Sequence, residues 1–367
     1  MVKTSTSSTP KPRIIAYYLP QYHPIQENDE WWGKGFTEWV SVANAKPLFK
    51  GHEQPKIPGE LGFYDLRLEE SRIAQAEIAA KYGVEGFCYW HYWLGNGKRL
   101  LERPFNEVLE SGKPDFPFCL GWANHSWKGV FFGAKNQTLI EQTYGDLKDH
   151  QEHFDYLLKA FKDKRYIKLG NKPLLYIYKA QDIPDCKKVL DFWRNLAIKE
   201  GFDGIHFIGE NVKPADREKY GLDGLAFPRH REIEYGDTDL ITNKYLRFIY
   251  HKIKKIAPGL KVYNYKDAIK TFLKPGEYQH NEYPCIVPGW DTTPRLGKKA
   301  VILKDSTPEL FKQHVKEVLN RVSHKPDDSN FIFIKSWNEW AEGNYMEPDW
   351  KNGSKYLEVL KEALDEQ

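Results

Sequence analysis

The chain has 367 residues, which exceeds the usual domain of about 100–200 residues but suits one α/β barrel of about 250 residues with long loops. Its 54 Lys and Arg residues against 51 Asp and Glu residues leave a net charge of +3, with both signs spread along the sequence. The sequence therefore has no basic field of the kind that binding to nucleic acids or anionic membranes needs, and neither partner is expected.

The amino-terminal stretch 1–12 is polar and contains two prolines, so we expect a disordered tail there and one domain over 13–367. It lacks the apolar stretch of about 7–15 residues that a signal peptide needs, and no run of about 20 apolar residues predicts a membrane span. The four cysteines stand far apart, mostly inside apolar runs, which is typical of buried thiols in a reducing compartment. These features favour a cytoplasmic protein, or a periplasmic or secreted one if a leader has been removed.

Eight short apolar runs rich in β-branched and aromatic residues recur along the chain. They are Arg13–Tyr18, Val84–Trp90, Phe116–Trp122, Leu174–Tyr178, Gly204–Ile208, Leu222–Phe227, Pro284–Pro288 and Phe331–Ser336. Such near-continuous runs predict strands that are covered on both faces, as parallel strands are. Helical patterns lie between several of them, at Leu66–Tyr82, Leu147–Phe161, Val189–Ile198, Leu310–Val322 and Tyr356–Leu364. This alternation predicts an α/β fold, a single (β/α)8 TIM-type barrel with long loops at the carboxyl ends of the strands.

Side chains just past each predicted strand are expected to line one mouth, because the strands of such a barrel all end at the same face. These candidates are Tyr18, Gln21, Tyr22, His23, Trp90, His91, Tyr92, Trp93, Asn124, His125, Trp127, Glu210, Arg229, Trp290, Asp291, Trp337, Asn338, Glu339, Trp340 and Glu342. Carboxylates, amides and imidazoles among flat rings suit a sugar, whose hydroxyl groups need polar partners and whose C–H faces stack on aromatic rings. We therefore predict that the mouth binds a glycan.

The aromatic stretch FCYWHYW, residues 87–93, ends the second predicted strand. Strand alternation puts Phe87 and Tyr89 on one face and Trp90 on the other, so one face lines the barrel or its mouth and the other packs under helices. Core packing is the favoured interpretation for Phe87 and Tyr89, because aromatic strand residues are usually buried. The rings at the strand end favour binding instead.

The sharpest motif is SWNEWAEG, residues 336–343, which places Glu339 and Glu342 three residues apart at the end of the last predicted strand. Glycosidic cleavage needs one carboxyl group held protonated to assist the leaving oxygen and a second kept ionised to attack or to activate an attacker. The rings of Trp337 and Trp340 would raise one of the two pKa values by desolvation. The alternative interpretation is that Glu342 caps a loop or pairs with a lysine.

Three long motifs stand in a characteristic order: IIAYYLPQYHPIQENDEWWGKGFTEW (Ile14–Trp39), FCYWHYW and WNEWAEG. With these motifs the sequence resembles the WbsX-like proteins, a branch related to glycoside hydrolase family 99, from about Pro12 to the C-terminus. The resemblance implies a (β/α)8 barrel that acts on glycans and, in family 99 itself, an endo-acting retaining mannanase. PQYHP and GFTEW are features of the WbsX-like branch.

The resemblance also implies roles for the two glutamates. Glu342 is similar to the general acid/base of family 99, and Glu339 is similar to its second catalytic carboxylate. In that family the second carboxylate deprotonates the 2-hydroxyl of the sugar, whose oxygen then attacks the anomeric carbon to give a 1,2-anhydro sugar. Glu339 would accordingly act as a base and never as a covalent nucleophile.

Three functions remain open. The favoured one is a retaining glycoside hydrolase that cleaves an α-linked, mannose-like or related sugar within a polysaccharide or oligosaccharide. The second is a glycosyltransferase or transglycosylase of surface-polysaccharide biosynthesis, a label given to other members of the branch, although no DxD-type site or Gly-rich phosphate loop stands in a suitable context. The third is a non-catalytic glycan-binding barrel, against which the intact carboxylate pair speaks.

No metal or other cofactor is expected, because the proposed chemistry needs none. His23, His91 and His125 follow three different predicted strands without the spacing of metal ligands, and the cysteines form no CxxC pair. Hydrogen bonding to substrate hydroxyls is the favoured task for these histidines. Besides the glycan, the sequence indicates no obligate protein partner.

Overall fold

The computed structural model describes residues 12–129, 138–234 and 260–367. Eight parallel strands form its central sheet: β1 (Arg13–Tyr18), β2 (Gly86–Trp93), β4 (Phe118–Trp122), β8 (Lys172–Ile177), β9 (His206–Gly209), β10 (Gly224–Phe227), β12 (Glu282–Ile286) and β14 (Phe331–Ile334). They pair in this order, and β14 also pairs with β1, which closes the sheet into a barrel. Each of the eight predicted runs overlaps one of these strands, so the predicted (β/α)8 barrel is confirmed.

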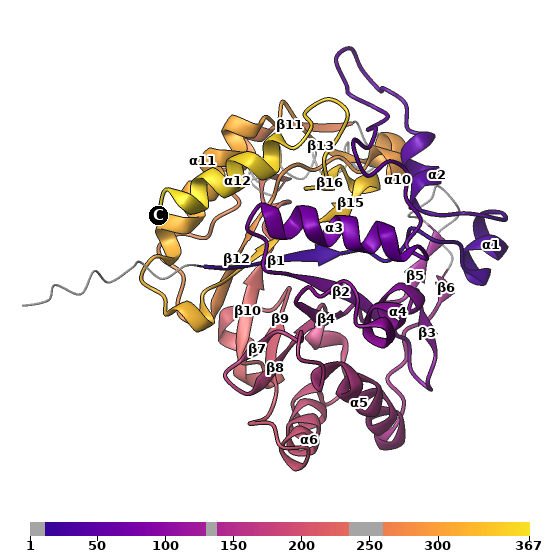
Figure 1. Ribbon diagram of the computed structural model, residues 1–367, viewed down its shortest axis with the longest axis vertical. Coiled ribbons are helices and arrows are strands. Elements are labelled where there is room, and N and C mark those ends of the chain that lie inside the picture. Colours follow the sequence, from indigo (N-terminus) through magenta and orange to yellow (C-terminus); the bar gives the residue numbers. More distant parts are fainter. Residues whose placement is uncertain (1–11, 130–137, 235–259) are drawn as a thin grey trace, which may run out of the picture.

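Helices surround the strands (Figure 1). They are α1 (Gln26–Trp32), α2 (Glu38–Ala43), α3 (Glu69–Lys81), α4 (Arg103–Ser111), α5 (Leu147–Phe161), α6 (Cys186–Lys199), α9 (Tyr265–Ala268), α10 (Thr293–Leu296), α11 (Pro308–Val322) and α12 (Lys355–Asp365). The five predicted helices correspond to α3, α5, α6, α11 and α12. Helix α5 begins where predicted because the Asp146 side chain accepts hydrogen bonds from the Lys148 and Asp149 amides and so caps its N-terminus. Between β9 and β10 stand only two short 3-10 turns, η3 (Pro214–Asp216) and η4 (Glu218–Tyr220).

Further short strands pair with strands of the barrel or with one another. They are β3 (Arg99–Leu100), which pairs with β2; β5 (Trp127–Lys128) with β6 (Thr138–Ile140); β7 (Lys168–Leu169) with β8; β11 (Lys261–Asn264) with β13 (Val301–Lys304); and β15 (Asn338–Glu339) with β16 (Asn344–Tyr345). The long loops after β1 and β12 meet each other, because the Asp291 carboxylate accepts a hydrogen bond from Gln54 at 2.7 Å and lies 2.8 Å from His52. Within the described ranges, no helix is long and apolar enough to cross a membrane. The tail expected at 1–12 lies almost wholly outside the described residues.

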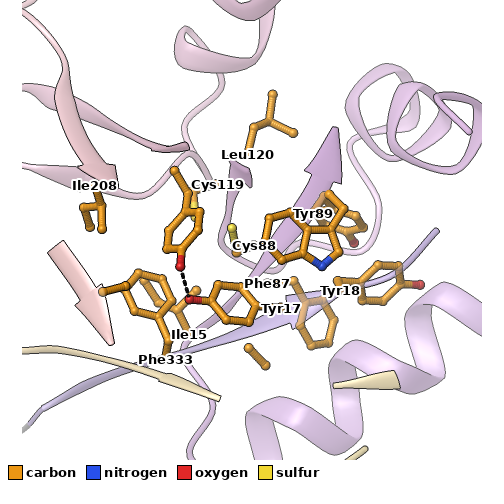
Figure 2. Close-up of a cluster of buried hydrophobic side chains, with 14 of the residues drawn as sticks. Ile15, Tyr17, Tyr18, Phe87, Cys88, Tyr89, Cys119, Leu120, Ile208 and Phe333 are labelled. Atoms are coloured by element: carbon orange, nitrogen blue, oxygen red, sulfur yellow. Dashed lines mark hydrogen bonds between the residues drawn. The ribbon is translucent and has the colours of Figure 1, made fainter. Parts of the chain in front are cut away.

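The two faces of β2 separate as strand alternation predicts. Phe87 and Tyr89 are buried against the helix layer, where the Tyr89 ring lies 5.3 Å from that of Phe105 in α4. Trp90 turns into the barrel and stacks on Tyr17 of β1 at 5.1 Å. Figure 2 shows the interior around Tyr17, whose hydroxyl donates a 2.8 Å hydrogen bond to that of a second buried tyrosine. The core interpretation of Phe87 and Tyr89 is therefore confirmed.

Candidate functional site

A cavity of about 510 Å³ is built by residues at the carboxyl ends of the strands and in the loops that follow them. The predicted site residues that line it are Gln21, Trp90, Tyr92, Asn124, His125, Trp127, Glu339 and Glu342. The wall also contains Lys179, which follows the fourth predicted strand, and residues that the sequence did not single out, among them Lys128, Tyr144, Tyr178, Asp182, Arg295 and Lys335. The cavity thus joins both glutamates to aromatic rings and to several cations.

The WNEWAEG segment is held in shape by hydrogen bonds near its start and by a glycine turn at its end. The Glu339 amide donates to the Ser336 hydroxyl at 3.0 Å, and the Asn338 side chain bonds both the amide and the carbonyl of Leu19 at the end of β1. Gly343 has a φ of +57°, and a Cβ atom there would stand 2.7 Å from the side chain of Asp291. Glycine is therefore required at this turn, and the folded segment aims both glutamates into the cavity.

The two tryptophans of this segment support it and do not line the cavity. Trp337 and Trp340 are fully buried, and the Trp340 ring stacks on Tyr345 at 3.7 Å. The Trp340 indole donates a 2.6 Å hydrogen bond to Glu347, which also accepts one from Tyr64 at 2.9 Å. Burial raises the pKa of Glu347 to about 7. These contacts fix the backbone beneath the glutamates, which is a structural task.

The two glutamates have opposite protonation tendencies. Although burial works to raise it, the pKa of Glu339 is lowered by the Lys335 ammonium, by a hydrogen bond from Glu342 and by Arg295. Lys335 Nζ lies 3.8 Å from Glu339, and the Trp90 indole donates to the same carboxylate at 3.2 Å. Burial and the nearby Glu339 charge raise the pKa of Glu342 to about 8. At neutral pH the site therefore holds one carboxylate and one carboxylic acid, as acid–base catalysis needs.

Arg295 of α10 connects this pair to the GFTEW motif. Its guanidinium donates to Glu342 at 2.6 Å and, through Nε, to Glu38 at 3.1 Å. Glu38 is fully buried, and burial raises its pKa against the effect of Arg295. Sequence reasoning missed Arg295, Glu38 and Lys335. The sequence did contain a local signal for Lys335. This lysine ends the apolar run FIFIK, and an unpaired cation is rarely placed in a barrel core.

Replacing Arg295 by Met is expected to destabilise the fold by about 3–5 kcal/mol, because Glu38 would be left buried without its cation. The double variant Arg295→Met/Glu38→Gln is expected to recover part of this loss. Denaturant unfolding measures both, with Arg67→Met as a control at an exposed ion pair with Asp65, where about 0–1 kcal/mol is expected. Strictly additive losses in the double variant would contradict a bridging role for Arg295.

Several predicted residues lie in the helix layer and not on the cavity wall. The Tyr18 hydroxyl bonds Gln75 of α3 at 2.7 Å. His91 Nε2 lies 2.8 Å from His153 Nε2 of α5, and Trp93 stacks on the same ring at 4.5 Å. The expectation that these three residues face the mouth is not met, since they occupy the strand positions whose side chains point outward between sheet and helices.

Other predicted residues surround the site without reaching the cavity. Tyr22 and Asn338 are buried, and the Tyr22 hydroxyl donates a hydrogen bond to the main-chain carbonyl of Asn338. His23 lines a separate cavity of about 250 Å³ beside α1 and α4. Arg229 donates to the Thr271 carbonyl at 3.4 Å. These side chains stabilise the loops that shape the mouth.

Glu210 and Trp290 flank the lysine of the site. The Glu210 carboxylate accepts a 2.8 Å hydrogen bond from Tyr176, and its charge is among those that raise the pKa of Lys335 against the effect of burial. The Trp290 ring centroid lies 5.4 Å from Lys335 Nζ. Both residues hence act on the site through Lys335, while Asp291 joins the two long loops.

The three histidines that follow predicted strands do not come together. His23 lines the second cavity, His91 lies in the helix layer, and His125 is on the wall of the main cavity. Over the described parts of the chain, no group of three His, Cys, Asp or Glu side chains has an arrangement that would hold a metal ion. A reaction without a metal stays a prediction.

Comparison with known proteins places the chain in a family. The family described as Glycosyltransferase WbsX matches residues 14–360. Two uncharacterised proteins named WxcX, from two strains of Xanthomonas campestris pv. campestris, are each 32% identical to the chain over 98% and 96% of its length. The chain spans about half the length of these relatives, 51% and 49%.

Solved structures share the barrel. A GH99 endo-alpha-mannosidase from Bacteroides thetaiotaomicron, in complex with bis-tris-propane, has a TM-score of 0.58 and 17% identity over 96% of each chain. A glycoside hydrolase-like protein has a TM-score of 0.54 and 17% identity over 97% of this chain and 94% of its own. At such identity the likeness shows the fold. The chain therefore belongs to the WbsX family, and it shares its barrel fold with a solved GH99 endo-alpha-mannosidase.

Proposed function

We propose that the protein is a retaining glycoside hydrolase that cleaves an α-linked, mannose-like or related sugar within a polysaccharide or oligosaccharide. One observation carries the proposal: Glu339 and Glu342 share one cavity, and their surroundings shift their pKa values in opposite directions. This division of protonation states is the arrangement that glycosidic cleavage uses. The fold shared with a GH99 endo-alpha-mannosidase supports the same reaction class.

In the proposed first step, protonated Glu342 gives its proton to the leaving glycosidic oxygen. Ionised Glu339 takes the proton of the 2-hydroxyl, and the freed oxygen attacks the anomeric carbon as the glycosidic bond breaks, which gives a 1,2-anhydro sugar. In the second step the Glu342 carboxylate deprotonates a water that opens this ring at the anomeric carbon, and Glu339 returns its proton to the 2-oxygen. Arg295, 2.6 Å from Glu342, stabilises the carboxylate that exists between the steps.

The remaining wall supplies what a sugar chain needs. Trp127 packs edge-on against Tyr92 at 5.3 Å, so two lining rings form one aromatic corner. The buried amide nitrogen of Gln21 has no hydrogen-bond partner among the described residues. A pyranose ring can stack on this corner, and Gln21 belongs to the same cavity wall.

Trp127→Ala is expected to weaken oligosaccharide binding by about 10-fold, because about 1.4 kcal/mol is the scale of one ring-stacking contact. Trp93→Ala serves as the matched control, since Trp93 stacks on His153 and donates to Asp149 in the helix layer. That variant should instead lose about 3–5 kcal/mol of stability. Titration calorimetry and thermal unfolding separate the two effects. If Trp127→Ala instead caused a large loss of stability and left the affinity unchanged, the Trp127 ring would be a core residue and not a sugar-binding one.

The reaction class is tested by incubating the protein with bacterial and plant polysaccharides and measuring released oligosaccharides. A hydrolase releases reducing sugar without any nucleotide-sugar donor. Product formation only with such a donor would favour a glycosyltransferase, the activity named in the description of the family. Binding without any product would favour a glycan-binding barrel.

A further inference from the structure

The outer wall of the main cavity carries two lysines next to aromatic rings. From this arrangement we propose that the bound glycan is acidic, and that Lys128 and Lys179 hold a carboxylate of a sugar residue that stacks on the neighbouring rings. The inference rests on the proposed function, because it names the substrate class of the same cavity. It concerns the outer part of the cavity and not the site of bond cleavage.

The cations at the floor of the cavity are already compensated by carboxylates. Arg295 is bonded to Glu38 and Glu342, and Lys335 faces Glu339 at 3.8 Å. With Glu342 protonated, Glu38 and Glu339 balance the charges of Arg295 and Lys335, so the floor has no unpaired cation to attract an anionic substituent. A negative charge on the substrate is therefore expected farther out.

The two outer lysines are weakly compensated. Lys128 of β5 is exposed, and no carboxylate of the described residues forms an ion pair with it. The sequence from 123 to 140 contains no Asp or Glu, and Glu141 is the first acidic residue after Lys128. Lys179 lies 3.7 Å from Asp182, and these side chains are 36% and 48% exposed. Asp182 also lines the cavity, but such an exposed pair is weak, so an anionic ligand can compete with Asp182 for Lys179.

The backbone of Lys179 is held in place by a residue of the cavity wall. The Asn124 side chain accepts a hydrogen bond from the Lys179 amide at 2.8 Å and donates one to its carbonyl at 2.7 Å, which locks this backbone beside the end of β4. Lys179 follows Tyr178, whose ring lines the cavity, and Lys128 follows Trp127 in the same way. Lys179 Nζ lies 5.9 Å from the centroid of the Tyr178 ring, so a pyranose against this ring would bring a carboxylate substituent close to an ammonium group, and Lys128 belongs to the same cavity wall.

The test uses the full chain with Glu342→Gln, so that bound glycan is not cleaved. The probes are polygalacturonate, alginate, hyaluronan and pyruvylated bacterial polysaccharides, each in native and carboxyl-reduced form, with yeast mannan and dextran as neutral polymers. Carboxyl reduction replaces the carboxylate by a hydroxymethyl group and leaves the linkage unchanged. Mild acid removes pyruvate ketals alone, which distinguishes a ketal carboxylate from that of a uronic acid.

We expect at least one native acidic polymer to bind, and its carboxyl-reduced form to bind at least about 10-fold more weakly. Added salt should weaken the native interaction, because half-exposed ion pairs are screened. Lys128→Gln and Lys179→Gln should each weaken binding, and the double variant should bind native and reduced forms alike. Lys361→Gln on α12, outside the cavity wall, should have no effect, and thermal unfolding should show that all variants are folded.

Equal binding of native and reduced forms, a preference for a neutral polymer, or no charge-dependent binding in the panel would overturn the inference. Cleavage by the wild-type protein is measured in parallel on the same polymers. If a neutral polymer is cleaved, the proposed hydrolase remains and the acidic substrate is wrong. If an acidic polymer binds through the lysines but releases no reducing ends, the acidic ligand is supported and the proposed hydrolysis is not.

Discussion

Glu342→Gln is expected to reduce the cleavage of a natural glycan by at least about 100-fold while glycan binding is retained. Gln preserves the size and hydrogen bonding of the side chain but has no proton to give to the leaving oxygen. An activated aryl glycoside should lose far less activity, because its leaving group needs little protonation. The ratio of the two losses, measured as kcat/KM, tests Glu342 as the general acid.

The pH profile provides a second measurement on the same residue. Because burial and Glu339 raise the pKa of Glu342 to about 8, the acid is protonated below that pH and loses its proton above it. Activity on the natural glycan should therefore be constant at neutral pH and fall as the pH rises through about 8. Equal losses of aryl-glycoside and natural-glycan activity in Glu342→Gln, or an unchanged alkaline limb, would contradict the assignment. Glu358→Gln is the control, since Glu358 is exposed on α12 and lies off the cavity wall.

A substrate with its 2-hydroxyl replaced by hydrogen or fluorine should bind, remain uncleaved and leave no covalent mass on the protein. The reason is that Glu339 is proposed to act as a base on this hydroxyl, whose oxygen is itself the nucleophile. An ordinary retaining pair, with its carboxyl groups about 5–5.5 Å apart, would instead trap a 2-fluoro sugar as a glycosyl ester. Mass spectrometry of the intact protein after incubation with a 2-fluoro glycoside decides between them.

A cyclohexane mimic of the 1,2-anhydro sugar should be the better ligand for the wild-type protein. Detection of a glycosyl adduct on Glu339 would refute the 2-hydroxyl mechanism and leave the hydrolase proposal intact. Lys335→Met is a useful companion, because Lys335 is one of the charges that lower the pKa of Glu339. Without that cation, Glu339 should ionise at higher pH, and the acid limb of the activity profile should move upward.

The strands were accessible to sequence reasoning because their signal is local. Each barrel strand is a short apolar run whose two faces are both covered, so eight such runs separated by helical patterns indicated the fold. Helix α5 likewise carried its cap and its apolar stripe within its own residues. The carboxylate pair was also found in one segment, since Glu339 and Glu342 are three positions apart.

The wall of the cavity was only partly accessible. Of the β2 ring stretch, Trp90 and Tyr92 reach the cavity, whereas His91 and Trp93 point to α5. Alternation predicted that two faces exist, but nothing in the stretch told which face the barrel would enclose. That choice depends on the register of β2 against its neighbours, which only the closed sheet determines.

By itself, the sequence determined the eight strands, the order of the barrel and the two glutamates at the end of the last strand. The tertiary structure decided the electrostatics of those glutamates. Arg295 stands 257 positions from Glu38 and 47 from Glu342, yet one guanidinium bonds both carboxylates in the fold. Periodicity reports only on neighbours in the chain, whereas a pKa depends on burial and on every charge within a few ångströms, wherever in the sequence it originates.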